Sequence, residues 1–273
     1  TSQELYEGLI ASGQNAFPSV SFDLGAINNF LSRFFAAGFY YKTFMGIPPF
    51  EWGKGTNIWM LYEKIIRKAA GMGKVSKLPD PDSYEHANDF CDVLIVGSGP
   101  SGEAAALEAA ENNLDVILVE QDNLCGGNQV SEHDFDFENK KDLLLKSGIK
   151  LMTRTTAFGL YDNSVAGLVE RVRDHKFITN DYLPRQRFWT IRSKQIILAT
   201  GSLERHLAFN NNDIPGVMTA NSAIQYLNRY GILLDKNIII STNNDSVYEV
   251  ASELSNAGSN VTIIDYREKI GKE

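Results

Sequence analysis

The chain has 273 residues, of which 43% are hydrophobic and 22% charged, so it is long enough and apolar enough for one large globular domain or two ordinary ones. Its formal net charge of −8 leaves no broad basic surface for phosphate backbones or anionic lipid. Nucleic acid is therefore excluded as an expected partner, and we expect a soluble, cytoplasmic protein.

Residues 1–88 are expected to form a mainly helical, aromatic-rich segment followed by a linker. Apolar residues at three-to-four spacing predict an amphipathic helix over residues 57–71. The aromatic stretch over residues 26–44 indicates either ordinary core packing or a surface that contacts another domain or subunit. Its apolar run is far shorter than the ~20 residues that cross a bilayer, so no membrane contact is expected. Proline and polar residues over 77–89 predict the linker.

A strand, a glycine-rich turn, a helix and a second strand are predicted in that order over residues 92–121, within a domain that spans residues 89–232. Gly97, Gly99 and Gly102 form the G-x-G-x-x-G pattern between the first strand and the helix. The first glycine allows a tight turn, the second lets a diphosphate approach the backbone, and the third lets helix and strand pack closely. Free N–H groups at the start of the helix favour negative charge. The pattern predicts a bound dinucleotide, the alternative being a Rossmann fold that binds nothing.

Glu120 ends the second predicted strand, where an acidic side chain can accept a hydrogen bond from a ribose 2′-hydroxyl and repel a 2′-phosphate. It therefore favours NAD or FAD over NADP. Gly126 and Gly127 follow in a loop that is either plain or passes close to the dinucleotide, and we favour contact. A buried strand then ends in "ATGS", whose Thr200 and Gly201 resemble the turn that closes over the dinucleotide in disulfide-reductase-like flavoproteins. The charged residues 204–206 are expected to be a solvated rim.

The expected contacts form one set, with neither catalytic nor metal-binding residues among them. The residues expected to bind the cofactor are Gly97, Ser98, Gly99, Pro100, Ser101, Gly102, Glu120, Gln121, Gly126, Gly127, Asn128, Ala157, Thr200 and Gly201.

The helix of this unit is expected over residues 101–112, and the rest of the domain should hold helices over residues 140–147 and 221–231, the last with Asn221 as cap and Gly231 as stop. Three β-like runs between them, separated by polar turns, predict an inserted β-meander. The two cysteines form neither a CxxC pair nor a metal quartet and are expected to be buried, reduced thiols.

A second, degenerate βαβ unit is predicted to begin within residues 233–273. Ser241, Asn243 and Ser246 are expected at its glycine positions, so their side chains would crowd the path of a diphosphate. Asp265 ends its second strand and is expected to be a surface residue. We predict a copy kept for packing, and hence one bound dinucleotide in all. The chain opens without Met and stops just after a strand, so we expect a fragment clipped at both ends.

Several motifs together resemble the α subunit of heterotetrameric sarcosine oxidase, among them "AGFYYKTFM", "ATGSLERHLAFNNNDIPGVM" and the glycine-free "STNNDSVYEVASEL". The resemblance implies a Rossmann architecture with two dinucleotide-binding domains, of the disulfide-reductase type, with a β-meander insertion. Related α subunits occur in opine oxidases, cyanide synthase and amino-acid dehydrogenases, which remain alternatives. So does a free-standing FAD-dependent pyridine nucleotide reductase, although it needs a CxxC pair or a working NAD(P)H domain.

The resemblance also implies cofactors and partners. It implies a bound NAD in this chain, with FAD as the alternative, and FAD and FMN in a complete complex with β, γ and δ subunits. That complex would act on sarcosine and tetrahydrofolate and release glycine, formaldehyde and hydrogen peroxide, with the amine oxidised in another subunit. This stretch alone is expected to be inactive. Glu103 departs from the usual small residue and is expected to place a negative charge near the diphosphate.

Overall fold

The computed structural model describes residues 77–132, 135–176, 182–210, 212 and 216–268, together with Glu4, Leu9, 22–27, Lys64 and Arg67. The chain divides into an N-terminal part, residues 3–81, and a C-terminal part, residues 82–273. The N-terminal part contains the short helix η1 (Leu24–Ala26). Most of the aromatic stretch over 26–44 and of the helix predicted over 57–71 lies outside the described residues. In the part of the chain that is described, no helix is long and apolar enough to cross a membrane.

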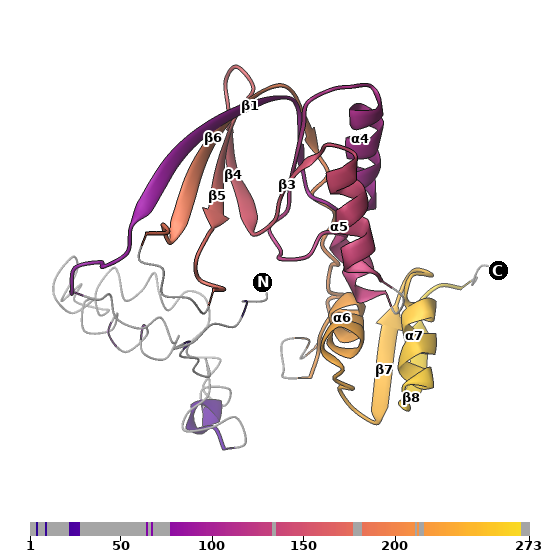
Figure 1. Cartoon of the computed structure of the whole chain (residues 1–273). Helices are drawn as coiled ribbons and strands as arrows, with labels where there is room; N and C mark the ends of the chain where they lie inside the picture. Colours follow the sequence, from indigo (N-terminus) through magenta and orange to yellow (C-terminus); the bar gives the residue numbers. More distant parts are fainter. Residues whose placement is uncertain are drawn as a thin grey trace, which may run out of the picture. The chain divides into compact units, whose positions relative to one another are not determined.

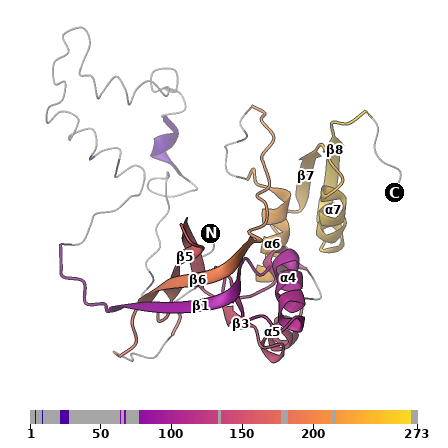
Figure 2. The same cartoon turned by 90° about the horizontal axis from the view of Figure 1, so that it is seen from above.

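A six-stranded sheet organises the C-terminal part, in the order β3-β2-β1-β6-β5-β4 (Figure 1). Strands β3, β2, β1 and β6 are parallel, whereas β6, β5 and β4 form an antiparallel meander. The long strands β1 and β6 run side by side (Figure 2), and β6 belongs to both the parallel part of the sheet and the meander. The strand bounds are β1 (Tyr84–Val96), β2 (Val116–Val119), β3 (Lys150–Met152), β4 (Thr155–Tyr161), β5 (Val165–Arg171) and β6 (Gln186–Leu198).

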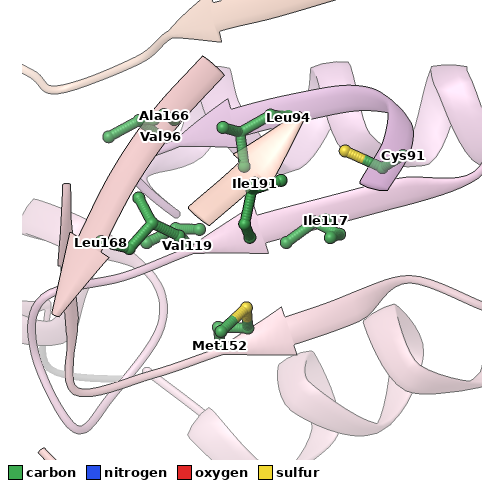
Figure 3. Packing of buried hydrophobic residues seen from close by; sticks show 9 residues of the cluster. All are labelled: Cys91, Leu94, Val96, Ile117, Val119, Met152, Ala166, Leu168 and Ile191. Carbon is green, nitrogen blue, oxygen red and sulfur yellow. The ribbon is translucent and has the colours of Figure 1, made fainter. Parts of the chain in front are cut away.

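Side chains of β1 and β2 alternate between two cores, as the two-residue period of a strand requires. Ile95 and Leu118 face helices α4 (Pro100–Glu111) and α5 (Phe137–Lys146). Leu94 and Ile117 face the meander and pack with Leu168 and Ile191 (Figure 3). The parallel strands therefore lie between a helical layer and the meander. Their carboxyl ends share one edge, which is where open α/β sheets bind ligands.

Capping residues set the helix ends. Asp136 accepts a hydrogen bond from the Asn139 amide at 3.0 Å, so α5 begins earlier than the predicted residue 140. Helix α6 (Ala220–Tyr230) is capped by Thr219, so the prediction that Asn221 is the cap is wrong. Gly231 ends this helix with φ of +66°, which confirms the predicted stop.

The linker predicted over residues 77–89 is wrong from Tyr84 onward, because β1 begins there and Tyr84 pairs with Gln186. This half of the strand is polar, and ion pairs hold it. For example, Arg187 donates to Glu85 at 2.7 Å. Its polarity removed the apolar pattern by which a strand is recognised in a sequence.

The second βαβ unit consists of β7 (Asn237–Thr242), α7 (Val247–Asn256) and β8 (Asn260–Asp265), with the two strands parallel. Helix α6 packs with it around a third core. The buried residues of this core are Ala223, Ile224, Ile240, Val247, Val250, Ala251 and Leu254.

Candidate dinucleotide site

The turn after β1 is built so tightly that two of its glycines admit no side chain. Gly97 has φ of +103°, and a Cβ there would lie 2.3 Å from the Ala199 carbonyl oxygen. A Cβ on Gly102 would lie 1.9 Å from the Gly97 carbonyl oxygen. The turn, the first turn of α4 and the residue after β6 are therefore in direct backbone contact, as close helix–strand packing requires.

Gly99 differs, because the chain itself does not require a glycine there. Its φ is −71° and its ψ is 178°, a conformation open to any residue. Within the described structure, the nearest atom to an added Cβ is the Cα of Gly127, at an ordinary 3.9 Å. Gly99 is also the N-cap of α4 and offers no side-chain cap to the amides of the first turn. The backbone at Gly99 therefore faces open space, and the first amides of α4 beside it have no side-chain acceptor. Helix N-termini with this geometry bind phosphate groups.

The second glycine loop lies against the first. Gly126 and Gly127 have φ of +123° and +58°, and a Cβ on Gly127 would lie 2.9 Å from the Cα of Gly99. The ring of Phe135 covers Gly126, since a Cβ there would lie 2.5 Å from it. Gly127 and Asn128 are exposed, so the face of this loop beside Gly99 can be reached by a ligand.

Glu103 does not present the free charge that was expected near the diphosphate. Its side chain is buried, and Oε2 forms an ion pair with Nζ of Lys140 at 2.7 Å. Burial raises the pKa of Glu103, and Lys140 opposes that rise. Lys140 also donates to Gln129 in η2 (Gly127–Ser131). The pair ties α5 and the second glycine loop to α4, so its charges are matched within the protein.

Glu120 lies at the same edge as the glycine turn and is held by three donors. Its Oε2 accepts from the Ser98 amide at 3.0 Å and the Ser98 hydroxyl at 2.8 Å, and its Oε1 accepts from the Asp122 amide at 2.9 Å. Glu120 is only 8% exposed. A carboxylate has about four acceptor positions, so one remains for a ribose hydroxyl. The predicted residues Ser98 and Glu120 are therefore brought together.

Most of the remaining predicted residues are exposed near the glycine turn, but Ala157 is not brought to it. Pro100 and Ser101 are exposed at the start of α4, and Thr200 and Gly201 are exposed just after the residue that contacts Gly97. Gln121 is exposed, although its carbonyl accepts from Arg171 at 2.8 Å. Ala157 lies on β4 and packs against the core between the parallel strands and the meander.

Sequence reasoning missed two residues beside Glu120. Arg229 in α6 donates to both carboxylate oxygens of Asp122, at 2.6 and 2.9 Å. Burial raises the pKa of Asp122, but the hydrogen bond and charge of Arg229, together with the Asn123 amide and the charge of Arg171, lower it below its usual value. The two residues lie 107 positions apart, so no local spacing links them. The charged residues 204–206 are exposed, as expected of a solvated rim, and the carboxylate of Glu204 also accepts from the first two amides of α6 at 3.1 and 2.8 Å.

The turn of the second βαβ unit is offset by one residue from the predicted alignment. Ile240 pairs with Ile263 and packs toward α7, as Ile95 pairs with Leu118 and packs toward α4. Counting forward from these equivalent pairs, the residues at the positions of Gly97, Gly99 and Gly102 are Thr242, Asn244 and Val247.

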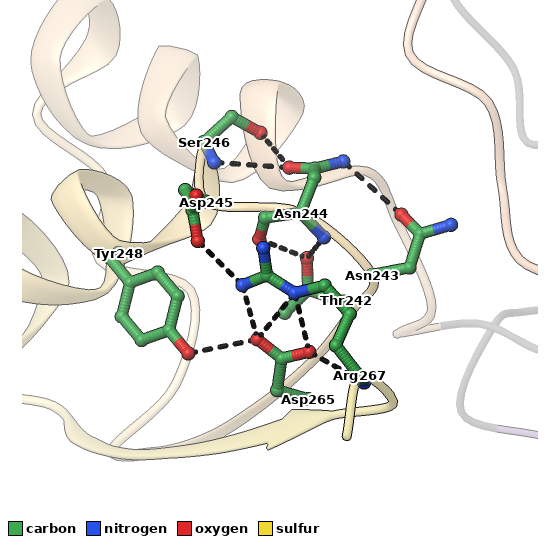
Figure 4. Close-up of polar contacts among 8 residues, drawn as sticks. All are labelled: Thr242, Asn243, Asn244, Asp245, Ser246, Tyr248, Asp265 and Arg267. Carbon is green, nitrogen blue, oxygen red and sulfur yellow. Dashed lines mark hydrogen bonds and ion pairs between the residues drawn. The ribbon is translucent and has the colours of Figure 1, made fainter. Parts of the chain in front are cut away.

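Polar side chains, with Asn244 at the centre, fill the second turn (Figure 4). The Asn244 carboxamide oxygen accepts from the Ser246 amide at 3.0 Å and the Ser246 hydroxyl at 2.6 Å. It therefore occupies an amide that would otherwise face a diphosphate. Asp245 adds a negative charge beside it, bonded to Arg267 at 2.6 Å. The turn does not fit a dinucleotide.

Asp265 is not the surface residue that was expected. Its side chain is 5% exposed, accepts from Arg267 at 2.7 Å and from the Tyr248 hydroxyl at 2.9 Å, and lies beneath them in Figure 4. The hydrogen bonds from Arg267 hold the pKa of Asp265 well below its usual range. The acceptor that would bind a ribose in a working unit is therefore used within the protein.

Comparison with known proteins gives a family and close relatives. The profile of the family described as pyridine nucleotide-disulphide oxidoreductase matches residues 91–273. The sarcosine oxidase subunit alpha of Rhizobium meliloti (strain 1021) is 46% identical over 99% of this chain and 28% of its own length. The subunit of that name from Corynebacterium sp. (strain U-96) is 36% identical over 74% of this chain and 22% of its own length. The resemblance indicated by the motifs is confirmed, and the chain spans less than a third of these relatives.

A solved structure matches the fold. The L-proline dehydrogenase from P. horikoshii is similar over 69% of this chain and 38% of that chain, with a TM-score of 0.52 and 23% identity. At this identity the likeness shows the fold alone. The predicted fold class, a mixed α/β Rossmann architecture of the disulfide-reductase type, is confirmed.

Proposed function

Because this chain belongs to the pyridine nucleotide-disulphide oxidoreductase family, we propose that the turn after β1 holds one dinucleotide, NAD in preference to NADP. The observation that carries the proposal is the meeting of Gly99 and Glu120 at one edge of the sheet. Gly99 leaves open space at uncapped helix amides, which suits a diphosphate. Glu120 offers a fixed carboxylate to the adjoining ribose and repels a 2′-phosphate.

The residues present fit the adenosine diphosphate half of such a cofactor, and each has a separate task. The amides at the start of α4 bind the diphosphate, Glu120 orients the ribose, and the loop of Gly126 and Gly127 allows close backbone approach. When bound, a nicotinamide or flavin dinucleotide supplies hydride-transfer chemistry. FAD carries the same adenosine diphosphate half and remains the alternative ligand.

We further propose that the chain is the nucleotide-holding part of a sarcosine oxidase α subunit, with the amine oxidised in another subunit. Its 46% identity to such a subunit over 99% of its length supports this assignment. The cysteines offer no support for a disulfide reductase. Cys91 and Cys125 are both buried, and burial raises the pKa of each thiol to about 11, which suppresses the reactive thiolate.

Calorimetric titration of the nucleotide-free chain with NAD, NADP and FAD tests the proposal. We expect one site per chain. NADP should bind at least about tenfold more weakly than NAD, because the repulsion between Glu120 and the 2′-phosphate should cost about 1.4 kcal/mol or more of binding free energy. Glu120→Gln should narrow this difference because it removes the repelling charge. Glu170→Gln, on the meander, is the matched control and should leave both affinities unchanged. Equal affinity of the unaltered chain for NAD and NADP, or no binding of either, would contradict the proposal.

A further inference from the structure

Helix α6 is bonded at both ends to loops that border the proposed nucleotide site. Its first two amides donate to the carboxylate of Glu204, which lies in the loop after Gly201. Near its last turn, Asn228 donates to the carbonyl of Ser131, the final residue of η2, at 2.6 Å. The same helix therefore touches the segment that follows β6 and the segment that follows the second glycine loop.

The last turn of α6 also reaches the residue that orients Glu120. Arg229 forms a two-point contact with the Asp122 carboxylate at 2.6 and 2.9 Å, and its side chain is only 17% exposed. The amide of the same Asp122 donates to Oε1 of Glu120 at 2.9 Å. A paired arginine and carboxylate fix both direction and distance. Arg229 therefore limits where the amide beside Glu120 can lie.

The opposite side of α6 packs into the second βαβ unit. Ala223 and Ile224 are buried there against Ile240, Val250 and Leu254. Asn228 adds a polar link, because its Nδ2 also donates to Glu253 in α7 at 2.7 Å. The helix is thus held from one side by a unit whose own turn is filled by side chains.

We infer that Arg229 is a positioning residue for the nucleotide site, through which α6 and the second βαβ unit hold Glu120 in the orientation that binds ribose. The inference rests on the proposed function, since it assigns a role to Glu120 in ribose binding. In this arrangement the second βαβ unit has a structural role that does not require it to bind a nucleotide. Its packed core keeps α6 in place, and α6 keeps Asp122 beside Glu120.

A binding ratio separates positioning from general stability. The full chain is titrated with ADP-ribose and with its 2′-deoxy analogue, which lacks the hydroxyl that Glu120 accepts. We expect the unaltered chain to prefer ADP-ribose by about tenfold or more, as a hydrogen bond to a charged group implies. In Arg229→Gln this preference should fall by at least about fivefold, the lower end of typical coupling between sites. Arg229→Lys, which keeps the charge, should retain part of it.

Arg187→Gln is the matched control, because Arg187 is also an arginine paired with carboxylates, those of Glu85 and Glu170, but lies on the meander. It should leave the ratio unchanged. If Arg229→Gln weakens both ligands by the same factor, or changes neither, Arg229 has no positioning role and the inference is overturned. If Arg229→Gln does not fold, an unchanged ratio in Arg229→Lys overturns it equally. Failure of the unaltered chain to bind ADP-ribose would overturn the proposed function itself.

Discussion

Replacing Gly99 by alanine should separate the needs of the ligand from the needs of the fold. The backbone angles at Gly99 suit alanine, and its methyl group would meet only Gly127 Cα at 3.9 Å. A compatible Gly→Ala change stabilises a protein by about 0.4–1 kcal/mol. At Gly102 the methyl would lie 1.9 Å from a backbone oxygen. Overpacking of that kind costs about 3 kcal/mol, which outweighs the ~1 kcal/mol that alanine gains in a helix.

The two variants should therefore move stability and binding in different ways. Gly99→Ala should leave the melting temperature nearly unchanged, because alanine is the poorer N-cap and this offsets its entropic gain, whereas Gly102→Ala should lower it by about 4–8 °C, from a net loss of roughly 2 kcal/mol. The methyl group introduced at position 99 would stand where a diphosphate approaches. If the diphosphate loses one charge-assisted hydrogen bond to a helix amide, its binding free energy weakens by about 1.5–3 kcal/mol. NAD affinity should then fall about 10- to 150-fold.

Differential scanning fluorimetry and calorimetric titration of the same preparations measure both quantities. If Gly99→Ala binds NAD as tightly as the unaltered chain while remaining folded, the diphosphate does not lie at this glycine. If it unfolds as readily as Gly102→Ala, the glycine serves the fold, and the reasoning that assigns it to a ligand is wrong.

Three further results are expected. Titrating NADH into nucleotide-loaded chain should show no second binding event, because Asn244 and Asp245 fill the second turn; saturable binding would show that turn to be open. Both thiols should resist a thiol reagent at pH 8 and react after denaturation, since burial raises each pKa to about 11; rapid labelling of folded protein would contradict this. The lowered pKa of Asp122 contributes stability that is present above the usual value of 3.8 and is lost as the pH falls through the lower folded value. Asp122→Asn should therefore flatten the loss of stability below about pH 4 seen by denaturant unfolding, and an unchanged acid profile would argue against the Arg229 contact.

The glycine turn could be predicted from the sequence because its requirements are local. A strand, three glycines at fixed spacing, a helix and an acidic residue lie within one short stretch. The glycines are required by close backbone contacts, and the acidic residue by its hydrogen bond to a ribose hydroxyl. The glycine turn is therefore determined by residues that are close to Gly97 in the sequence. The contact of this turn with Ala199, the residue after β6, was not predicted, because the "ATGS" motif indicated only a turn that closes over the dinucleotide.

Other features depend on pairings that the sequence does not display. The polar half of β1 is a strand because β6 pairs with it along its length, so Tyr84 carries no local signal. The contact of Arg229 with Asp122 joins positions 107 apart. In the second unit, the pairing of Ile240 with Ile263 and its packing toward α7 show which residue replaces each glycine. A shift of one residue changes the facing of every side chain on a strand, so spacing alone misplaced that alignment.

The retained nucleotide tests most directly whether this chain has one working dinucleotide site that rejects a 2′-phosphate. Purified chain is incubated with NAD, NADP and FAD at equal concentrations, desalted and denatured, and the released nucleotide is identified and counted by mass spectrometry. We expect a single dinucleotide per chain, without a 2′-phosphate. Two dinucleotides per chain, or NADP as the retained species, would contradict it.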